Sequence, residues 1–371
     1  MEAQRWWPED RPVIEGFDGV RAIAALAIVV FHVHTTMLPA EPAVVAWVAR
    51  HGWMGVDLFF TLSGFLITGI LLRTRGRPGY FTSFYKRRVL RIFPLYYGAV
   101  GLLLARRWLR DGPVAIPAWA ALLFQTNWYA ASAEEDLGLV VTWSLSIEEQ
   151  FYLVWPALVL WAPLARLPWL IGGVAVLAPV YRAWVHDPSN LASYMFTPGR
   201  LDALGLGALA AVVWHLRMER AVDWAGRLTA PAVGLMVAML VWGVSDRADW
   251  GVAVVGYSVF AALTAVALLG VASGGAPWLT RGLSWAPLVA VGRVSYGLYL
   301  LHPLVLSNVV VFGRAAGLPF RTEPWAGVVG HLVVAALSVG LATVSFHLIE
   351  SPILALKDRW APTPRAGGSG G

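Results

Sequence analysis

The sequence predicts an all-α protein, a polytopic transmembrane helix bundle of about ten spanning helices with one further re-entrant or interfacial segment. Of the 371 residues, 58% are hydrophobic and 13% are charged, whereas a soluble domain is about half apolar and about a quarter charged. The apolar residues form long blocks, and many of the 20 tryptophans lie near block ends. Tryptophan is enriched at membrane interfaces, so lipid is the expected solvent for most of the chain.

The chain contains eleven apolar blocks, of which ten are predicted to cross the membrane, because a helix of about 20 residues spans the hydrocarbon core. The block at 114–131 has Pro113 at its edge and contains Pro117, Gln125 and Asn127. These residues favour a re-entrant or interfacial segment there. The predicted spans are residues 20–38, 53–72, 92–105, 147–165, 169–185, 201–214, 230–245, 251–271, 288–312 and 326–349.

Basic residues predict the orientation of the bundle. The stretch at 73–91 carries seven Lys or Arg residues, and the positive-inside rule places such a loop in the cytoplasm. Both termini are then expected to be cytoplasmic in a multi-pass protein of the cell inner (plasma) membrane, with the acidic run at 134–136 outside. The predicted organisation is a cytoplasmic N-terminal segment (1–19), a transmembrane domain (20–352) and a flexible cytoplasmic tail (353–371), whose terminal GGSGG resembles an engineered linker.

Composition also excludes several classes of function. The chain has no cysteine, which rules out disulfides, thiol nucleophiles and thiolate metal sites, and we expect no metal site. The net charge of +6 could indicate nucleic acid. However, the basic residues lie between apolar blocks and not along one stripe, so the expected partner is the lipid bilayer and no nucleic acid.

The first predicted span carries three ionisable residues, Arg21, His32 and His34. Arg21 and His32 are eleven residues apart, which is about 16 Å along a helix and nearly the same face. An arginine for an anionic ligand group and a neutral imidazole as base would fit this stripe. The alternative is a snorkelling Arg21 and a His32 that is hydrogen-bonded within the bundle. For His34, which faces elsewhere, packing is the favoured interpretation.

A basic cluster, Lys86, Arg87, Arg88 and Arg91, precedes the third predicted span. Arg88 and Arg91 are three residues apart and share a helix face. Planar guanidinium groups fit phosphate oxygens, which would suit an anionic ligand. The alternative is a cluster that only orients the helix beside anionic lipid.

The segment TWSLSIEEQFYLVWP places Ser144, Glu148 and Tyr152 four residues apart, so that they share a helix face. Glu148 and Glu149 are expected at the outer mouth of a span, where a carboxylate could orient or protonate a partner. The alternative is an ordinary helix start with acidic residues in the first turn and Ser144 or Ser146 as the cap.

Two further polar pairs lie within or beside predicted spans. Asp57 and Ser63 interrupt the second span, and packing is favoured over catalysis for Ser63. Arg200 and Asp202 precede a helix rich in small residues, where we expect a local ion pair between them.

The last two spans also carry candidates. Ser295, Tyr299 and His302 share one helix face, and His302 lies about mid-membrane before Pro303. Glu350 is expected to pair with a basic loop residue near the inner end of the last span.

These motifs, in this order, resemble the acyltransferase-3 family, membrane acyltransferases that O-acylate bacterial surface polysaccharides and some macrolide antibiotics. The resemblance covers almost the whole chain and rests on GFDGVRAIAALAIVVFHVH, GVDLFFTLSGFLI, RRVLRIFPLYY, TWSLSIEEQFYLVWP, SYGLYLLHPLV and FHLIESPIL. It implies acyl-CoA, commonly acetyl-CoA, as cytoplasmic donor, essential Arg21 and His32, and a contribution from Glu148. Many relatives carry a fused extracytoplasmic hydrolase-like domain. This chain ends soon after its last span and is expected to resemble the stand-alone members.

The residues and the resemblance together predict an integral membrane O-acyltransferase without a tightly bound cofactor. His32 is the predicted general base toward a sugar hydroxyl, with an acyl-histidine intermediate as the alternative, and Glu148 completes the catalytic pair. The predicted acyl-CoA-binding residues are Arg21, Arg87, Arg88 and Arg91. Possible supporting residues, among them candidate oxyanion donors, are Asp57, Ser63, Ser144, Glu149, Tyr152, Tyr299 and His302.

Two other functions stay open at this point. A transporter or flippase of lipid-linked sugars or small molecules would also bury Arg, His and Glu among helices, although no internal repeat is evident. A non-catalytic scaffold that senses acyl-CoA would bind without turnover. The acceptor is open as well, because surface polysaccharide, peptidoglycan, glycolipid and macrolide all present sugar hydroxyls.

Overall fold

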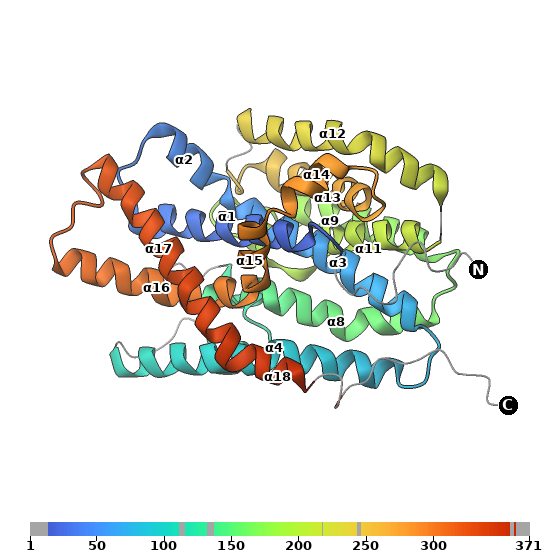
Figure 1. Ribbon diagram of the computed structural model, residues 1–371, viewed down its shortest axis with the longest axis horizontal. Helices are drawn as coiled ribbons and strands as arrows, with labels where there is room; N and C mark the ends of the chain where they lie inside the picture. Colours follow the sequence, from blue (N-terminus) through green and yellow to red (C-terminus); the bar gives the residue numbers. More distant parts are fainter. Residues whose placement is uncertain are drawn as a thin grey trace.

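The computed structural model describes residues 14–110, 116–131, 137–216, 218–242, 246–356 and 360. Every regular element in these ranges is a helix, so the all-α prediction is confirmed (Figure 1). The predicted acidic run at 134–136, the N-terminal segment up to residue 13 and most of the predicted tail lie outside the described residues.

Ten long helices form the bundle, and eight shorter α-helices connect or flank them. The long helices are α1 (Phe17–Met37), α3 (Gly55–Thr74), α4 (Tyr80–Arg110), α8 (Trp143–Trp161), α9 (Leu167–Val185), α11 (Leu201–His215), α12 (Glu219–Val241), α13 (Tyr257–Ala272), α16 (Ser295–Ala315) and α17 (Pro324–Ser345). The shorter ones are α2 (Ala43–Arg50), α5 (Ala118–Leu122), α6 (Asn127–Ala130), α7 (Leu137–Val140), α10 (Ala192–Met195), α14 (Pro277–Leu283), α15 (Ala286–Arg293) and α18 (Ser351–Ala355). Two 3-10 helices, η1 (Gly52–Met54) and η2 (Thr197–Arg200), and two π-helices, η3 (Val252–Gly256) and η4 (Phe346–Glu350), complete the described elements.

Eight of the described helices are long and apolar enough to cross a membrane, which confirms a polytopic membrane bundle. Helices α8 and α11 are not among the eight, and α11 has only 15 residues. The predicted total of ten crossings therefore stays a prediction. Residues 116–131 form only α5 and α6, which are too short to span the hydrocarbon core. This agrees with the prediction that the block does not cross.

The predicted basic loop at 73–91 is wrong in its extent. The connection between α3 and α4 is only residues 75–79, where Gly76 and Gly79 adopt φ of 73° and 76°. Helix α4 begins at Tyr80 and continues through Pro94, so the basic cluster is part of the helix. The error has a physical reason: a long basic side chain can remain in a membrane helix when its charged head finds polar partners.

The start of α8 also differs from the sequence-based expectation. The helix begins at Trp143, preceded by Thr142 with no side-chain cap, so neither Ser144 nor Ser146 is the cap. Glu148 and Glu149 consequently lie in the second turn and not in the first. The alternative of an ordinary helix start, with acidic residues in the first turn that complement the helix dipole, is therefore wrong.

Glycines let α3 and α11 pack with their backbones almost in contact. A Cβ at Gly64 would lie 1.9 Å from the carbonyl oxygen of Leu204, and a Cβ at Gly207 would lie 1.9 Å from that of Thr61. Small residues at such contacts are typical of helix pairs in membranes. This close packing fixes α3, which carries two of the predicted site residues.

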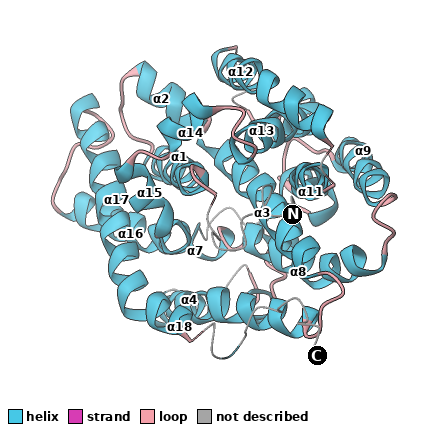
Figure 2. Ribbon diagram, turned by 45° about the vertical axis from the view of Figure 1, so that its right-hand side comes forward, coloured by secondary structure: helices cyan, strands magenta, loops and turns pink. Residues whose placement is uncertain are grey.

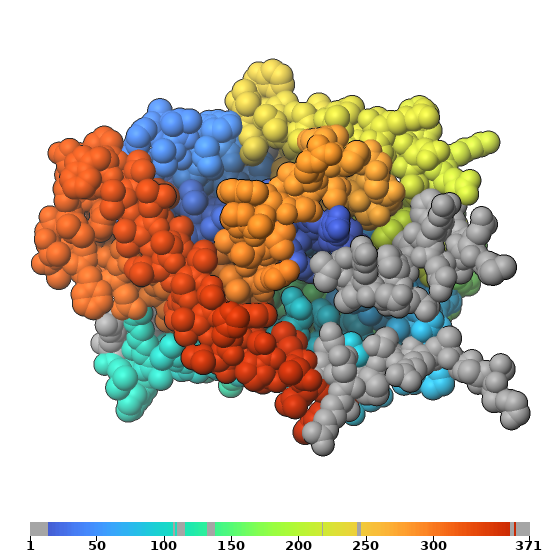
Figure 3. All heavy atoms as spheres, viewed as in Figure 1, coloured from blue at the N-terminus to red at the C-terminus, as the bar shows by residue number. Residues whose placement is uncertain are grey.

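Helix α1 lies in the interior of the bundle. Figure 2 shows α1 and α3 surrounded by other helices, and later helices cover most of α1 on the face in Figure 3. A Cβ at Gly292 of α15 would lie 1.9 Å from the carbonyl oxygen of Asp18, so α15 packs directly on the start of α1. By contrast, α9 and α12 are peripheral and expose large apolar side chains such as Trp184 and Leu235, as expected of lipid-facing helices.

Candidate active site

Two histidines from distant parts of the chain meet inside the bundle. Nδ1 of His32 on α1 lies 2.8 Å from Nε2 of His302 on α16, and the two rings stack with an interplanar angle of 11°. His302 is fully buried, whereas His32 is partly exposed. His32 is therefore the member of the pair that a substrate can reach.

The hydrogen bonds of His302 determine which nitrogen of His32 is free. Nδ1 of His302 lies 2.7 Å from the backbone carbonyl oxygen of Tyr299, and a carbonyl can only accept a hydrogen bond. For two neutral rings, Nδ1–H of His302 donates to Tyr299, so Nε2 of His302 accepts from Nδ1–H of His32. Nε2 of His32 is left with its lone pair and has no partner among the described residues, as a general base requires.

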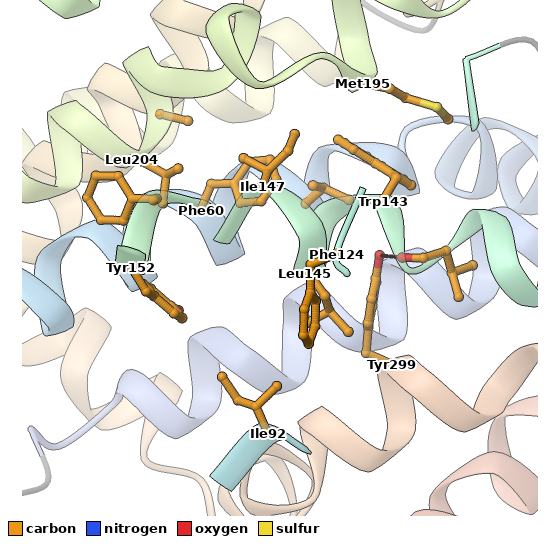
Figure 4. Packing of buried hydrophobic residues seen from close by; sticks show 14 of the residues in the cluster. Phe60, Ile92, Phe124, Trp143, Leu145, Ile147, Tyr152, Met195, Leu204 and Tyr299 are labelled. Carbon is orange, nitrogen blue, oxygen red and sulfur yellow. Dashed lines mark hydrogen bonds between the residues drawn. The ribbon is translucent and has the colours of Figure 1, made fainter. Parts of the chain in front are cut away.

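Tyr299 anchors this chain of contacts to α7 and α8. Its hydroxyl donates to the backbone carbonyl of Val141 at 2.7 Å, a bond that Figure 4 shows as a dashed line. Ser144 lies 2.7 Å from the same hydroxyl oxygen and can donate to it. The predicted supporting residues Ser144 and Tyr299 are thus brought together with His302. Because the Tyr299 proton is engaged by Val141, a role for this hydroxyl as oxyanion donor would require that bond to break.

A second polar cluster lies one helical turn further along α8. Ser63 Oγ on α3 is 2.6 Å from the Tyr152 hydroxyl, and Glu148 lies close enough to interact with both side chains. Figure 4 shows Tyr152 pointing into the interior from its helix. The Ser63 hydroxyl therefore joins α3 to α8 beside the predicted catalytic glutamate.

Arginines from α1 and α4 converge on this second cluster. Glu148 interacts electrostatically with Arg88 and Arg91, and Glu149 interacts with Arg88. Arg21 interacts with Arg91 as well, although both are cations. An anion bound between them would relieve this repulsion, and guanidinium groups fit phosphate oxygens. We call Arg21, Arg88 and Arg91 the arginine cluster.

Other predicted features of the arginine region are placed differently. Arg87 directly precedes Arg88 and therefore lies about 100° round the α4 helix from it. Arg21 also contacts Asp18, at 2.5 Å between its guanidinium and the carboxylate. Glu350, expected beside a basic loop residue, is buried at the end of η4 and interacts with Arg91 of helix α4.

The two clusters are connected along α8. Ser144 belongs to the histidine cluster and Glu148 to the arginine region, and four helical residues correspond to about 6 Å. Helix α8 runs opposite to α1, because Ser144 lies toward His32 and Tyr152 interacts with Arg21. The predicted α1 stripe thus lies beside a polar stripe on α8.

The predicted local pair between Arg200 and Asp202 is wrong. Arg200 forms an ion pair with Asp57, and Asp202 forms one with Arg182 at 2.8 Å; all four side chains are fully buried. Arg200 ends η2 whereas Asp202 is already in α11, so the two side chains take different partners. Asp57 therefore joins α3 to η2 and is fully buried in that ion pair.

The structure also places His34 and a residue that the sequence did not single out. His34 is 2.5 Å from Glu41, as expected of a packing residue that faces away from His32. Arg247, in the connection between α12 and η3, interacts electrostatically with His32. Its position after an apolar span was the only signal in the sequence. Among the described residues, no group of three or more His, Asp or Glu is arranged to hold a metal ion.

The chain is similar to known acyltransferases over nearly its whole length. A family model described as an acyltransferase domain, the acyltransferase-3 model, matches residues 14–346. The chain is 30% identical to the "Putative peptidoglycan O-acetyltransferase YrhL" of Bacillus subtilis over 92% of this chain and 55% of that protein. It is 29% identical to the peptidoglycan O-acetyltransferase OatA of Listeria monocytogenes over 92% of this chain and 56% of that protein.

The chain spans about half the length of the curated relatives that it matches. No solved structure gives a significant match. The family model nevertheless covers both the histidine pair and the arginine cluster, and extends over nearly all the described helices. On this evidence, the chain belongs to the acyltransferase-3 family of membrane acyltransferases.

Proposed function

We propose that this chain is an integral membrane O-acyltransferase that moves an acyl group, typically acetyl, from acyl-CoA to a hydroxyl of a sugar-containing acceptor. The observation that carries the proposal is the hydrogen-bond chain from His32 through His302 to the Tyr299 carbonyl. This chain leaves Nε2 of the partly exposed His32 free. His32 lies near one end of α1, and the arginine cluster lies at the other end.

The donor binds at the arginine end in this proposal. Arg21, Arg88 and Arg91 hold the phosphates of CoA, and the positive-inside rule assigns this end to the cytoplasm. The uncharged pantetheine arm then extends along the face between α1 and α8. About 16 Å of helix separates Arg21 from His32, so the arm carries the thioester into the membrane while the charged nucleotide remains at the surface.

The histidine end carries out the transfer. His32 Nε2 removes the proton from the acceptor hydroxyl as the oxygen attacks the thioester carbonyl. The tetrahedral intermediate collapses with cleavage of the C–S bond, and the CoA thiolate recovers the proton from His32. His302 stabilises the imidazolium that forms between these steps, because its Nε2 accepts a hydrogen bond from His32 Nδ1–H.

An acyl-histidine route uses the same atoms. His32 Nε2 would attack the thioester carbonyl with release of the CoA thiolate; the acceptor hydroxyl would then attack the acyl-imidazole, breaking its C–N bond, and the hydroxyl proton would pass to the thiolate. Both routes need the same tautomer of His32. Glu148 interacts with Arg88 and Arg91 at the donor end and is assigned to orienting the donor.

The relatives indicate the class of acceptor. YrhL and OatA are named as peptidoglycan O-acetyltransferases, and peptidoglycan is a polymer of sugars with free hydroxyls. We therefore propose a bacterial cell-surface glycan as the acceptor of the acyl group.

The test uses purified protein in lipid vesicles with acetyl-CoA labelled in the acetyl group and a soluble glycan acceptor. Free CoA and labelled acceptor are measured for the wild type, His32→Ala and His34→Ala. We expect His32→Ala to lower turnover by roughly 10²- to 10⁴-fold. His34→Ala is a matched control on the same helix, paired with Glu41, and should retain turnover.

Wild-type turnover by His32→Ala would reject the assignment of the base. Movement of a sugar across the vesicle membrane without release of CoA would instead favour a transporter. Binding of acetyl-CoA without any CoA release, in the presence of acceptor, would favour a non-catalytic acyl-CoA sensor.

A further inference from the structure

Arg247 holds its guanidinium against two aromatic rings beside the histidine pair. Its Cζ lies 5.1 Å from the ring centre of Phe31 and 5.4 Å from that of Tyr194. Both rings are buried, while Arg247 itself is partly exposed. Cation–π contacts of this kind hold a guanidinium in place without cancelling its charge.

Arg247 differs from Arg21, Arg182 and Arg200 in how its charge is balanced. Arg182 and Arg200 each have a buried aspartate partner, and Arg21 has Asp18. Arg247 has no carboxylate within salt-bridge distance among the residues that the structure describes. Its positive charge is therefore available to a ligand.

The backbone around Arg247 is fixed by hydrogen bonds. The hydroxyl of Tyr257 donates to the Arg247 carbonyl at 2.5 Å. The neighbouring carboxylates are used by the chain itself: Asp246 accepts from the amide of Ala248 at 2.8 Å, and Asp249 accepts from the amide of Val252 at 3.0 Å. The two acids nearest in sequence thus stabilise the turn and leave the guanidinium unpaired.

The position of Arg247 links it to the proposed reaction. The Phe31 ring, which packs on its guanidinium, is centred 5.4 Å from the ring of His32, and Arg247 interacts electrostatically with His32 itself. Arg247 lies at the histidine end of α1, far along the stripe from the arginine cluster. An acceptor whose hydroxyl reaches His32 Nε2 would therefore bring its neighbouring groups close to Arg247.

We infer that Arg247 binds an anionic group, a carboxylate or a phosphate, carried by the sugar-containing acceptor. This inference rests on the proposed function, and it adds a charge requirement to the acceptor. A carboxylate would be a substituent of the sugar, and a phosphate would come from a phosphorylated or lipid-linked sugar. Either group would neutralise Arg247 and hold the acceptor with a charge-assisted hydrogen bond.

The experiment compares acceptors that differ only in charge. Vesicles containing the purified protein receive acetyl-CoA and one of three glycosides: a neutral sugar, the matching uronic acid, or the matching sugar phosphate. Each glycoside is scored both as an acetylated product and as an inhibitor of transfer to the glycan acceptor. The proteins are the wild type, Arg247→Gln, Arg247→Lys and Arg227→Gln. Arg227 is the matched control, since it also lies over an aromatic ring, that of Trp224, at 5.8 Å on peripheral α12.

We expect the wild type to bind at least one anionic glycoside more tightly than the neutral sugar. Whichever of the uronic acid and the sugar phosphate binds more tightly shows whether Arg247 takes a carboxylate or a phosphate. Arg247→Gln should raise the KM or inhibition constant of that glycoside by about tenfold or more. The KM or inhibition constant of the neutral glycoside should not change, and neither should the KM for acetyl-CoA. Arg247→Lys should recover part of the loss, and Arg227→Gln should match the wild type.

The inference is wrong if neither anion is preferred to its neutral twin, or if Arg247→Gln weakens neutral and anionic glycosides equally. Failure of the proposed function would give a different result. With every acceptor, the wild type would then release no more CoA than the His32→Ala variant. CoA release without a preference for anions overturns only the assignment of Arg247.

Discussion

The bundle contains two groups of arginines that differ in how their charge is balanced. Arg182 and Arg200 are fully buried, and each is paired with an aspartate from another element. The arginine cluster is partly exposed, draws cations from α1 and α4 together, and has its acids distributed around it. The difference teaches that a buried arginine held by one aspartate joins helices, whereas partly exposed arginines that share several acids are placed to take an anionic ligand as well.

The largest effect should follow from breaking one of the two buried ion pairs. Asp57→Ala leaves Arg200 as an uncompensated charge in the interior, which costs about 3–5 kcal/mol of folding free energy. Thermal unfolding in detergent should show a large drop in Tm together with loss of activity. The double variant Asp57→Ala/Arg200→Met should recover much of the stability, because it removes the unpaired cation. Equal instability of both variants would contradict this role.

The next effect concerns the residue that orients the base. His302→Ala removes the acceptor for His32 Nδ1–H, so the free lone pair of His32 is no longer directed to Nε2. We expect kcat to fall by about 100-fold with little change in the KM for acetyl-CoA. Steady-state kinetics and the pH dependence of kcat provide the measurement. A change confined to KM, or to stability, would mean that His302 only packs.

A smaller effect should separate the arginine cluster from the neutralised pairs. Arg91→Ala removes an exposed cation that is not held by a single buried acid, so stability should change little while the KM for acetyl-CoA rises about tenfold. Titration of CoA binding and of Tm on the same samples would test both parts. Arg227→Ala, on exposed α12, is the control. A loss of Tm like that of Asp57→Ala would place Arg91 among the structural arginines.

The smallest effect concerns the anchor of the histidine pair. Tyr299→Phe removes the hydrogen bonds to Val141 and Ser144, which should cost about 1 kcal/mol and lower kcat a few-fold. Tyr296→Phe is a matched control on the same helix, since its hydroxyl donates to the Ile92 carbonyl at 2.8 Å. Both variants should lose similar stability, but only Tyr299→Phe should lower kcat. An equal loss of kcat in both variants would show that the Tyr299 hydroxyl has no specific role at the site.

Helical periodicity allowed parts of the fold and of the site to be predicted. The apolar blocks indicated the bundle, and the four-residue spacing correctly placed Glu148 and Tyr152 on one face with a common partner, Ser63. Such stripes can be read from one segment, because the helix geometry is fixed by the chain itself.

Contacts between distant segments could not be predicted in this way. His32 and His302 are 270 residues apart, and Asp57 and Arg200 are 143 apart. Their pairing depends on which helices are neighbours, and hydropathy carries no information on that. The same limit explains why the sequence pairs Arg200 with its nearest acid, Asp202, and gives no reason to single out Arg247.

The tautomer of His32 tests the central claim most directly. Protein labelled with 15N at histidine can be studied by NMR in lipid at neutral pH, with the His32→Gln variant subtracted to isolate one ring. We predict a neutral ring with a protonated Nδ1 and a free Nε2. A proton on Nε2, or a doubly protonated ring in the resting protein, would contradict the assignment of His32 as the base.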